Sequence, residues 1–203
     1  MRASEPGLER DGWKTAARSR QYADTHLEVV SEEVQTPSLP RPKAWTTVHR
    51  KSAVVIAAMT REGKFLLVRQ ERIPIRLAIW EMPAGQIDEE QPGRDEIEAT
   101  AVRELCEETG YELAEDGELI ALGDFFASPG FTDERQFLFL ARPVVRAAGK
   151  GRHAEEFITD CRAFSGEELR RMIAEGEIRD ANTLSTFARL AARGLLAFES
   201  GSV

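Results

Sequence analysis

Runs of hydrophobic and β-branched residues, bounded by polar, glycine or proline positions, dominate the first two thirds of the chain and predict β-strands. Two strongly apolar runs, residues 52–60 and 64–71, flank a short polar stretch that contains Gly63, which predicts a hairpin. Residues 79–88 predict a short strand that ends in a loop. The expected strands cover residues 26–36, 44–52, 52–60, 64–71, 79–88, 119–126 and 135–145.

Helical periodicity replaces this pattern in three later segments. It covers residues 95–109, where Gly110 is placed to adopt the left-handed conformation that ends a helix. Ser165 and Glu168 match the S-x-x-E capping box before a second helix, and residues 181–198 predict a third. Strands with helices before and after them predict an α/β (α+β) fold, a sandwich built on a mixed sheet.

The change of pattern along the chain predicts three parts. Residues 1–24 are polar and weakly patterned, which predicts a flexible N-terminal arm. Residues 25–50 predict a small β subdomain, and residues 51–203 predict the main domain. No apolar stretch has the length of a signal-peptide core or approaches the roughly 18 residues of a membrane span, so we expect a cytoplasmic protein.

The composition limits the classes of partner. The chain has 203 residues, of which 42% are hydrophobic and 31% are charged, as in ordinary globular proteins. Its net charge of -8 disfavours electrostatic binding to nucleic acid or to an anionic membrane surface, so we expect neither partner. Cys106 and Cys161 lie far apart and match no disulfide or zinc-binding pattern.

Three glutamates, Glu104, Glu107 and Glu108, crowd the predicted helix of residues 95–109. On a helical wheel they occupy an arc of roughly 100° beside an apolar stripe. That stripe consists of Ala101, Val102, Leu105 and Cys106. Like charges repel at i,i+4, so either the glutamates lie on a solvated surface helix or a cation lies between them. Hard cations such as Mg²⁺ bind carboxylate and carbonyl oxygens, and the nearby Pro-Ala-Gly loop favours a cation site.

The segment of residues 103–111, Arg-Glu-Leu-Cys-Glu-Glu-Thr-Gly-Tyr, resembles the second half of the Nudix box. The full pattern of that box is G-x5-E-x7-R-E-U-x-E-E-x-G-U, where U is a bulky apolar residue, and this half matches at every fixed position. The first half departs from the pattern, because Asp95 replaces the glutamate and the loop after Gly85 is four residues longer. The resemblance implies that Asp95 pairs with Arg103 and steadies the loop on the helix.

The flanking segments are similar to the ADP-ribose pyrophosphatase branch of this family. Residues 125–135 resemble its S-P-G-x-[ST]-x-E loop, and residues 68–74 resemble its strand with a Q-x-R sequence. Residues 174–192 resemble its closing helix after G-x-I-x-[DN], and residues 44–50 resemble a segment that presents a tryptophan and an arginine. An ADP-ribose-like ligand needs such groups, because a purine stacks on an aromatic ring and guanidinium groups bind phosphate oxygens.

The resemblance implies a Nudix α/β/α sandwich that hydrolyses ADP-ribose, or a related nucleoside diphosphate sugar, to AMP and ribose 5-phosphate. It also implies a homodimer in which residues 25–50 reach the active site of the other subunit and contact the substrate base. The expected cofactor is Mg²⁺, with Mn²⁺ as an alternative. The expected metal ligands are Glu104, Glu107, Glu108 and the carbonyl of Ala84. The expected substrate contacts are Trp45, Arg50, Arg72, Gln86, Ser128 and Gly130.

Three residues are expected to take part in the chemical step. Arg103 is given an orienting role, and Glu107 is a further metal ligand or holds the attacking water. Glu156, with Glu155 beside it, is the candidate general base, although either could be solvated charge before a strand.

Rival functions stay open at this point. The same metal site would serve another nucleotide sugar, such as GDP-mannose, and a panel of substrates would separate the two. A non-catalytic ADP-ribose-binding module is disfavoured by the intact Glu104, Glu107 and Glu108. Processing of RNA caps or triphosphate ends is disfavoured by the acidic net charge and by the family-like loop of residues 125–135.

Overall fold

The structure is a computed structural model that describes residues 12–89, 92–148 and 157–196. The chain forms two compact units. One contains Met1–Lys51 and Phe126–Glu134, and the other contains Ser52–Phe125 and Arg135–Val203. Within the described ranges, every helix is too short or too polar to cross a membrane.

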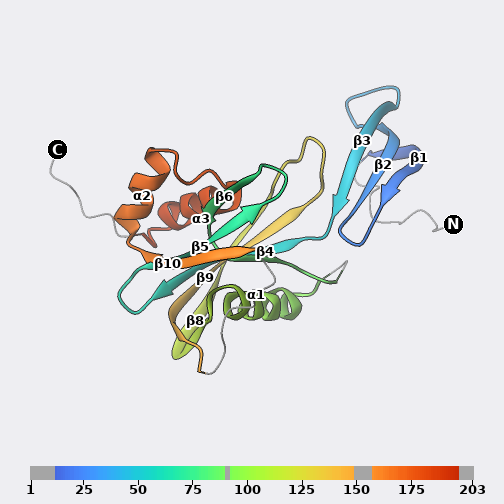
Figure 1. Cartoon of the computed structure of the whole chain (residues 1–203). Coiled ribbons are helices and arrows are strands. Elements are labelled where there is room, and N and C mark those ends of the chain that lie inside the picture. The colour runs from blue at the N-terminus through green and yellow to red at the C-terminus, as the bar shows by residue number, and fades with distance from the viewer. Residues whose placement is uncertain (1–11, 90–91, 149–156, 197–203) are drawn as a thin grey trace. The chain divides into compact units, whose positions relative to one another are not determined.

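The first unit contains a three-stranded antiparallel sheet, drawn in blue in Figure 1. Its strands are β1 (Lys14–Ala23), β2 (Leu27–Gln35) and β3 (Lys43–Arg50), in that order. The prediction of a flexible arm over residues 1–24 is therefore wrong for β1, which pairs with β2 along its length. Almost all of β1 is exposed, so it lacks the apolar alternation by which a half-buried strand is found. Residues 1–11 lie outside the described part of the chain.

The second unit is built on a mixed sheet with the strand order β10-β5-β4-β9-β8, with β6 paired to β5 and β7 paired to β4 (Figure 1). Strands β4 and β9 run parallel, whereas β5 is antiparallel to β4, β6 and β10. The bounds are β4 Ala53–Thr60, β5 Phe65–Arg72, β6 Leu77–Glu81, β7 Ala84–Gln86, β8 Tyr111–Phe126, β9 Arg135–Arg146 and β10 Ile158–Phe164.

Helices cover both faces of this sheet (Figure 1). Helix α1 (Arg94–Thr109) packs Ile97, Ala101 and Leu105 on one face. Helices α2 (Gly166–Ala174) and α3 (Ala181–Ala192) pack Leu169 and Leu190 on the other. Strand β4 is covered on both sides, which explains why its sequence is apolar without alternation. The predicted α/β/α sandwich with a mixed sheet is confirmed.

The structure confirms the predicted end of the first helix and the predicted start of the second. Gly110 follows α1 with φ of 72°, and its N–H donates to the carbonyl of Cys106. Ser165 and Glu168 form the expected reciprocal capping box, with hydrogen bonds of 2.7 and 3.1 Å. The third helix ends earlier than the predicted residue 198, because α3 stops at Ala192 and the chain turns.

Candidate active site

The loop between β6 and α1 lies against two glutamates of the helix. Glu108 Oε2 accepts a 2.9 Å hydrogen bond from the backbone N–H of Ala84. Glu104 lies directly over Gly85, where an added Cβ would be 1.9 Å from the Glu104 Cδ atom. Only glycine leaves room for that carboxylate. Two side chains one helical turn apart therefore contact two consecutive residues of the loop.

The acidic arc of α1 divides into buried and half-exposed members. Glu104 and Glu108 are only 5% and 3% exposed, whereas the Glu107 side chain is 26% exposed. A solvated surface helix is therefore the wrong interpretation for the first two. The predicted apolar stripe needs one correction, because Val102 is 39% exposed and Ile97 packs in the core with Ala101 and Leu105 instead.

Arg103 lies between the glutamates and binds two of them. Its Nη2 is 2.8 Å from Glu104 Oε1, and its Nη1 is 2.5 Å from Glu107 Oε2. Burial lowers the pKa of Arg103, but the two carboxylates outweigh it and the net shift is upward. The predicted pairing with Asp95 is wrong in this structure. Helix α1 begins at Arg94, so Asp95 lies in its first turn, and eight residues span about 12 Å along a helix axis.

These residues offer the kind of oxygen donors that a hard divalent cation binds. Glu104, Glu108 and the carbonyl of Ala84 supply only oxygen atoms, as Mg²⁺ requires. Across the described ranges, no three acidic, histidine or cysteine side chains converge into a complete metal site. The backbone carbonyl, water and substrate oxygens would therefore complete the coordination, in the way Mg²⁺ is commonly bound. The residues present fit the expected cofactor.

In the second unit, Arg72 of β5 and Glu81 of β6 form an ion pair. Glu81 is 2% exposed, and Arg72 binds its carboxylate through Nε at 3.0 Å and through Nη2 at 2.7 Å. Burial raises the pKa of Glu81, and the guanidinium of Arg72 works against that shift. Gln86, another predicted substrate contact, lies on β7 opposite Ala53 and is half-buried.

The remaining predicted substrate residues meet within the first unit. The Trp45 side chain is half-exposed, and its indole Nε1 donates a 3.1 Å hydrogen bond to the carbonyl of Gly130. The Lys43 ammonium lies 5.1 Å from the centroid of the Trp45 ring. The carbonyl of Ser128 accepts hydrogen bonds from the next turn of the same loop. The indole is thus held in one orientation and stays about half-exposed.

Further contacts join the loop of residues 126–134 to β3. The N–H of Val48 donates to the carbonyl of Phe131 at 2.7 Å. The His49 Nδ1 atom is 2.6 Å from Asp133 Oδ2, and Arg50 Nη1 is 3.1 Å from Glu134 Oε2. The ion pair of His49 with Asp133 was not predicted, because neither residue is among the specified positions of the family-like segments that contain them. Glu155 and Glu156, the candidate bases, lie outside the described residues.

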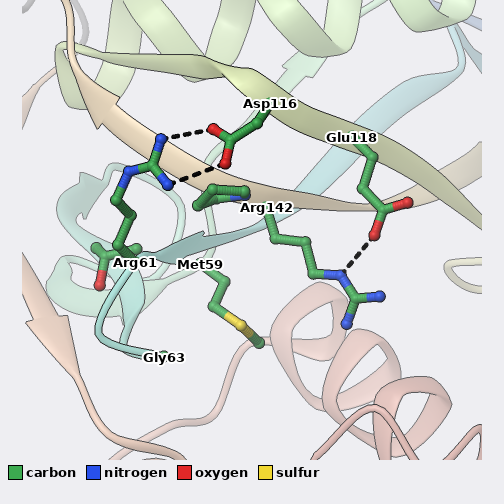
Figure 2. A pocket seen from close by; sticks show the side chains of 8 residues that line it. Met59, Arg61, Gly63, Asp116, Glu118 and Arg142 are labelled. Atoms are coloured by element: carbon green, nitrogen blue, oxygen red, sulfur yellow. Dashed lines mark hydrogen bonds and ion pairs between the residues drawn. The ribbon is translucent and has the colours of Figure 1, made fainter.

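A surface depression of about 330 Å³ lies elsewhere in the second unit (Figure 2). Two ion pairs line it: Arg61 with Asp116, and Arg142 with Glu118 at 2.9 Å. None of the predicted catalytic, metal-binding or substrate-binding residues belongs to its lining. The depression is therefore separate from the acidic site on α1.

Comparison with known proteins is consistent with this geometry. Residues 48–187 match the model of the NUDIX domain. The chain is 32% identical over 170 residues to an ADP-ribose pyrophosphatase of Bacillus subtilis, covering 84% of this chain and 88% of that protein. It is 31% identical over 160 residues to a GDP-mannose pyrophosphatase of Klebsiella pneumoniae, covering 73% and 74%. A solved structure, "Crystal structure of ADP compounds hydrolase", superposes with a TM-score of 0.72 at 14% identity over 93% of this chain and 99% of that one.

The chain belongs to the NUDIX family, since the family model spans more than half of its length. It is a Nudix pyrophosphohydrolase, and its sequence is like that of ADP-ribose pyrophosphatases. Enzymes of this family typically use a divalent metal ion, which agrees with the oxygen donors on α1 and the loop before it.

Proposed function

We propose that the protein hydrolyses the diphosphate bond of ADP-ribose, giving AMP and ribose 5-phosphate, with Mg²⁺ as cofactor. The observation that carries this proposal is the pair of buried carboxylates, Glu104 and Glu108, held against Ala84 and Gly85. The substrate is supported by relatives named ADP-ribose pyrophosphatase in Bacillus subtilis and Mycobacterium tuberculosis, each 32% identical over the aligned part.

In the proposed mechanism, Glu104, Glu108 and the carbonyl of Ala84 would hold Mg²⁺. When bound, the cation polarises the phosphoryl oxygens and neutralises the charge that develops as the P–O–P bridge breaks. Arg103 holds the carboxylates of Glu104 and Glu107 by the ion pairs described above. Glu107 serves as a further ligand or orients the attacking water.

The chemical step needs a base that accepts the proton of that water. Water attacks one phosphorus atom, a new P–O bond forms, and the bridging oxygen leaves with the other phosphate. We assign the proton to Glu156, with Glu155 as the alternative. General-base catalysis typically contributes about 10²- to 10⁴-fold, so replacement of the base slows turnover without removing metal binding.

Substrate contacts complete the proposal. Trp45 stacks on the purine, which its half-exposed and hydrogen-bonded indole favours. Arg50 and Arg72 bind phosphate oxygens. The ribose phosphate is contacted by Gln86 and by the loop that contains Ser128 and Gly130. We further propose a homodimer in which Trp45 and Arg50 serve the active site of the other subunit.

A panel of nucleotide sugars with product identification tests this function. Mg²⁺-dependent release of AMP and ribose 5-phosphate, with ADP-ribose as the best substrate, is the expected result. Preference for GDP-mannose would move the protein to the second candidate function, which the relative in Klebsiella pneumoniae supports. Binding of ADP-ribose without turnover would instead indicate a non-catalytic binding module.

A further inference from the structure

The ion pair of Arg72 and Glu81 lies on the face of the main sheet that α1 covers. Leu66 of β5 packs in the same core cluster as the apolar residues of α1. Side chains alternate along a strand, so Val68 and Arg72 share the face of Leu66. Glu81 of β6 is opposite Val68 in the antiparallel pair and therefore points to this face too. The pair thus shares a face with Glu104 and Glu108.

Glu81 binds one edge of the Arg72 guanidinium group. Arg72 Nε is 3.0 Å from Oε1 and 3.2 Å from Oε2, and Nη2 is 2.7 Å from Oε2. These are the only Arg72 side-chain hydrogen bonds to described residues, and they leave the N–H groups of Nη1 for another partner. The guanidinium group is planar. Hydrogen bonds from one of its edges to Glu81 therefore fix the direction in which the N–H groups of the opposite edge point.

Burial separates the roles of the two side chains. The Glu81 side chain is 3% exposed, whereas the Arg72 side chain is 41% exposed. A ligand that arrives from solvent can therefore contact Arg72 but not Glu81. The negative charges of Asp180 and Glu108 also act on Arg72, so its surroundings favour the charged guanidinium.

The backbone that carries Glu81 is anchored by α3. The N–H of the next residue, Met82, donates to Thr183 Oγ1 at 2.9 Å, and Thr183 Oγ1 donates to Asp180 Oδ2 at 2.8 Å. Thr183 is fully buried. The backbone directly after Glu81 is therefore tied to α3 by a chain of two hydrogen bonds.

We propose that Glu81 is a positioning residue that aims the free edge of Arg72 at a phosphate of the diphosphate substrate and does not itself touch the substrate. This proposal rests on the proposed function and extends it to a residue outside the Nudix box. An arginine that is already held in one orientation loses less conformational entropy when it binds a ligand. The hydrogen bonds from Arg72 to Glu81 therefore strengthen substrate binding through Arg72.

A double-mutant cycle tests the proposal with methylenediphosphonate and Mg²⁺, a probe that cannot be hydrolysed. Calorimetry is performed on the full chain, on Arg72→Ala, on Glu81→Gln and on the double variant. We expect Arg72→Ala to weaken binding by about 10- to 100-fold, as for loss of a charged hydrogen bond. Glu81→Gln should weaken binding several-fold, but cause no further loss when Arg72 is already alanine.

Controls separate positioning from general stability. Glu118→Gln breaks an ion pair with Arg142 in the depression of Figure 2 and should leave binding unchanged. Glu81→Asp keeps the negative charge on a side chain one methylene shorter. It should bind the probe more tightly than Glu81→Gln does, while the two variants have similar melting temperatures. It also serves as the test variant if Glu81→Gln does not fold. For ADP-ribose, Glu81→Gln should raise KM more than it lowers kcat.

Two results would overturn the proposal: native binding by Glu81→Gln, or the same loss from this substitution with and without Arg72. Neither depends on turnover. If the proposed function is wrong, the full chain will not hydrolyse ADP-ribose in Mg²⁺. The calorimetric cycle would still show whether Glu81 acts through Arg72.

Discussion

Glu104 and Glu108 are two acidic side chains that the fold removes from water one helical turn apart. Burial of like charges is costly unless hydrogen bonds, cations or both compensate. Part of that compensation comes from Arg103 and from the N–H of Ala84. Under the proposed function, a divalent cation held by both carboxylates would add to this compensation, and its binding would then stabilise the folded state.

Glu108→Gln tests the metal ligand. The amide oxygen can still accept the hydrogen bond of Ala84, so the fold should persist, while the ligand charge is lost. We expect Mg²⁺-dependent hydrolysis of ADP-ribose to fall by at least about 100-fold, as for loss of a main electrostatic contact. Steady-state assays over a range of Mg²⁺ concentration measure this loss.

Glu98→Gln is the matched control for that substitution, because Glu98 lies on the same helix in an exposed ion pair with Arg94. It should retain native turnover. Native turnover by Glu108→Gln would remove Glu108 from the metal site.

The His49–Asp133 pair predicts a pH dependence. The hydrogen bond to Asp133 raises the pKa of His49, and burial opposes that shift. Protonated His49 is therefore favoured in the folded state. Its stabilising contribution is complete below the unfolded pKa of about 6.5 and is lost as the pH rises through the higher folded pKa. The advantage of the native chain over His49→Gln in unfolding free energy should shrink from pH 6 to pH 9.

Urea denaturation at the two pH values measures that advantage, and the histidine signals in NMR give the titration midpoint of His49. Asp133→Asn is the control, because it removes the charged partner and should lower the midpoint. An unchanged midpoint in Asp133→Asn would show that the pair does not cause the shift.

At the scale of elements, local signals identified most helices and buried strands. Gly110 and the Ser165–Glu168 box marked helix ends because a left-handed glycine and a capping box have local causes. Strand β1 was missed because pairing to β2 defines it and its own side chains are mostly exposed. The Asp95–Arg103 pairing failed because the two residues lie about 12 Å apart along one helix, and Arg103 binds Glu104 and Glu107 instead.

Gly85→Ala tests the contact between the loop and α1. The new methyl group would overlap the Glu104 carboxylate, so that side chain or the loop must move. Overpacking of this kind typically costs about 1–3 kcal/mol in unfolding free energy. Because Glu104 is also a proposed metal ligand, hydrolysis should fall as well. Denaturant unfolding and turnover measure the two effects.

Gly166→Ala provides the control for this substitution. No atom lies within 4 Å of the position that its Cβ would occupy, and it begins α2. Its unfolding free energy should stay within about 0.5 kcal/mol of the native value, as for ordinary surface positions. Native stability and turnover in Gly85→Ala would mean that the loop has more room than the structure shows.

At the scale of the whole molecule, the sequence predicted that Trp45 and Arg50 lie in a small subdomain, but not that the loop of residues 126–134 joins the same unit. The loop of residues 126–134 lies far along the chain from β3, yet it belongs to the same compact unit. That association depends on tertiary contacts such as Trp45 with Gly130 and Arg50 with Glu134. The motif on α1, in contrast, was recognisable because its residues follow one another on a single helix.

This partition allows a test of the proposed homodimer. The proposed base-binding residues, Trp45 and Arg50, lie in one unit, and the proposed metal ligands lie in the other. If each active site combines one unit from each subunit, two defective variants can restore one intact site in a mixed dimer. The first variant carries Trp45→Ala with Arg50→Ala, and the second carries Glu108→Gln.

Co-expression of these two variants with different affinity tags yields mixed dimers together with both kinds of homodimer. At equal amounts, half of the dimers are mixed and one of their two sites is intact, so we expect about a quarter of native hydrolysis at low ADP-ribose concentration. Glu104→Gln with Glu108→Gln is the control pair, because both defects lie in the same unit and no combination repairs them. Activity no greater than that of the separate variants would place all the residues of a site in one chain.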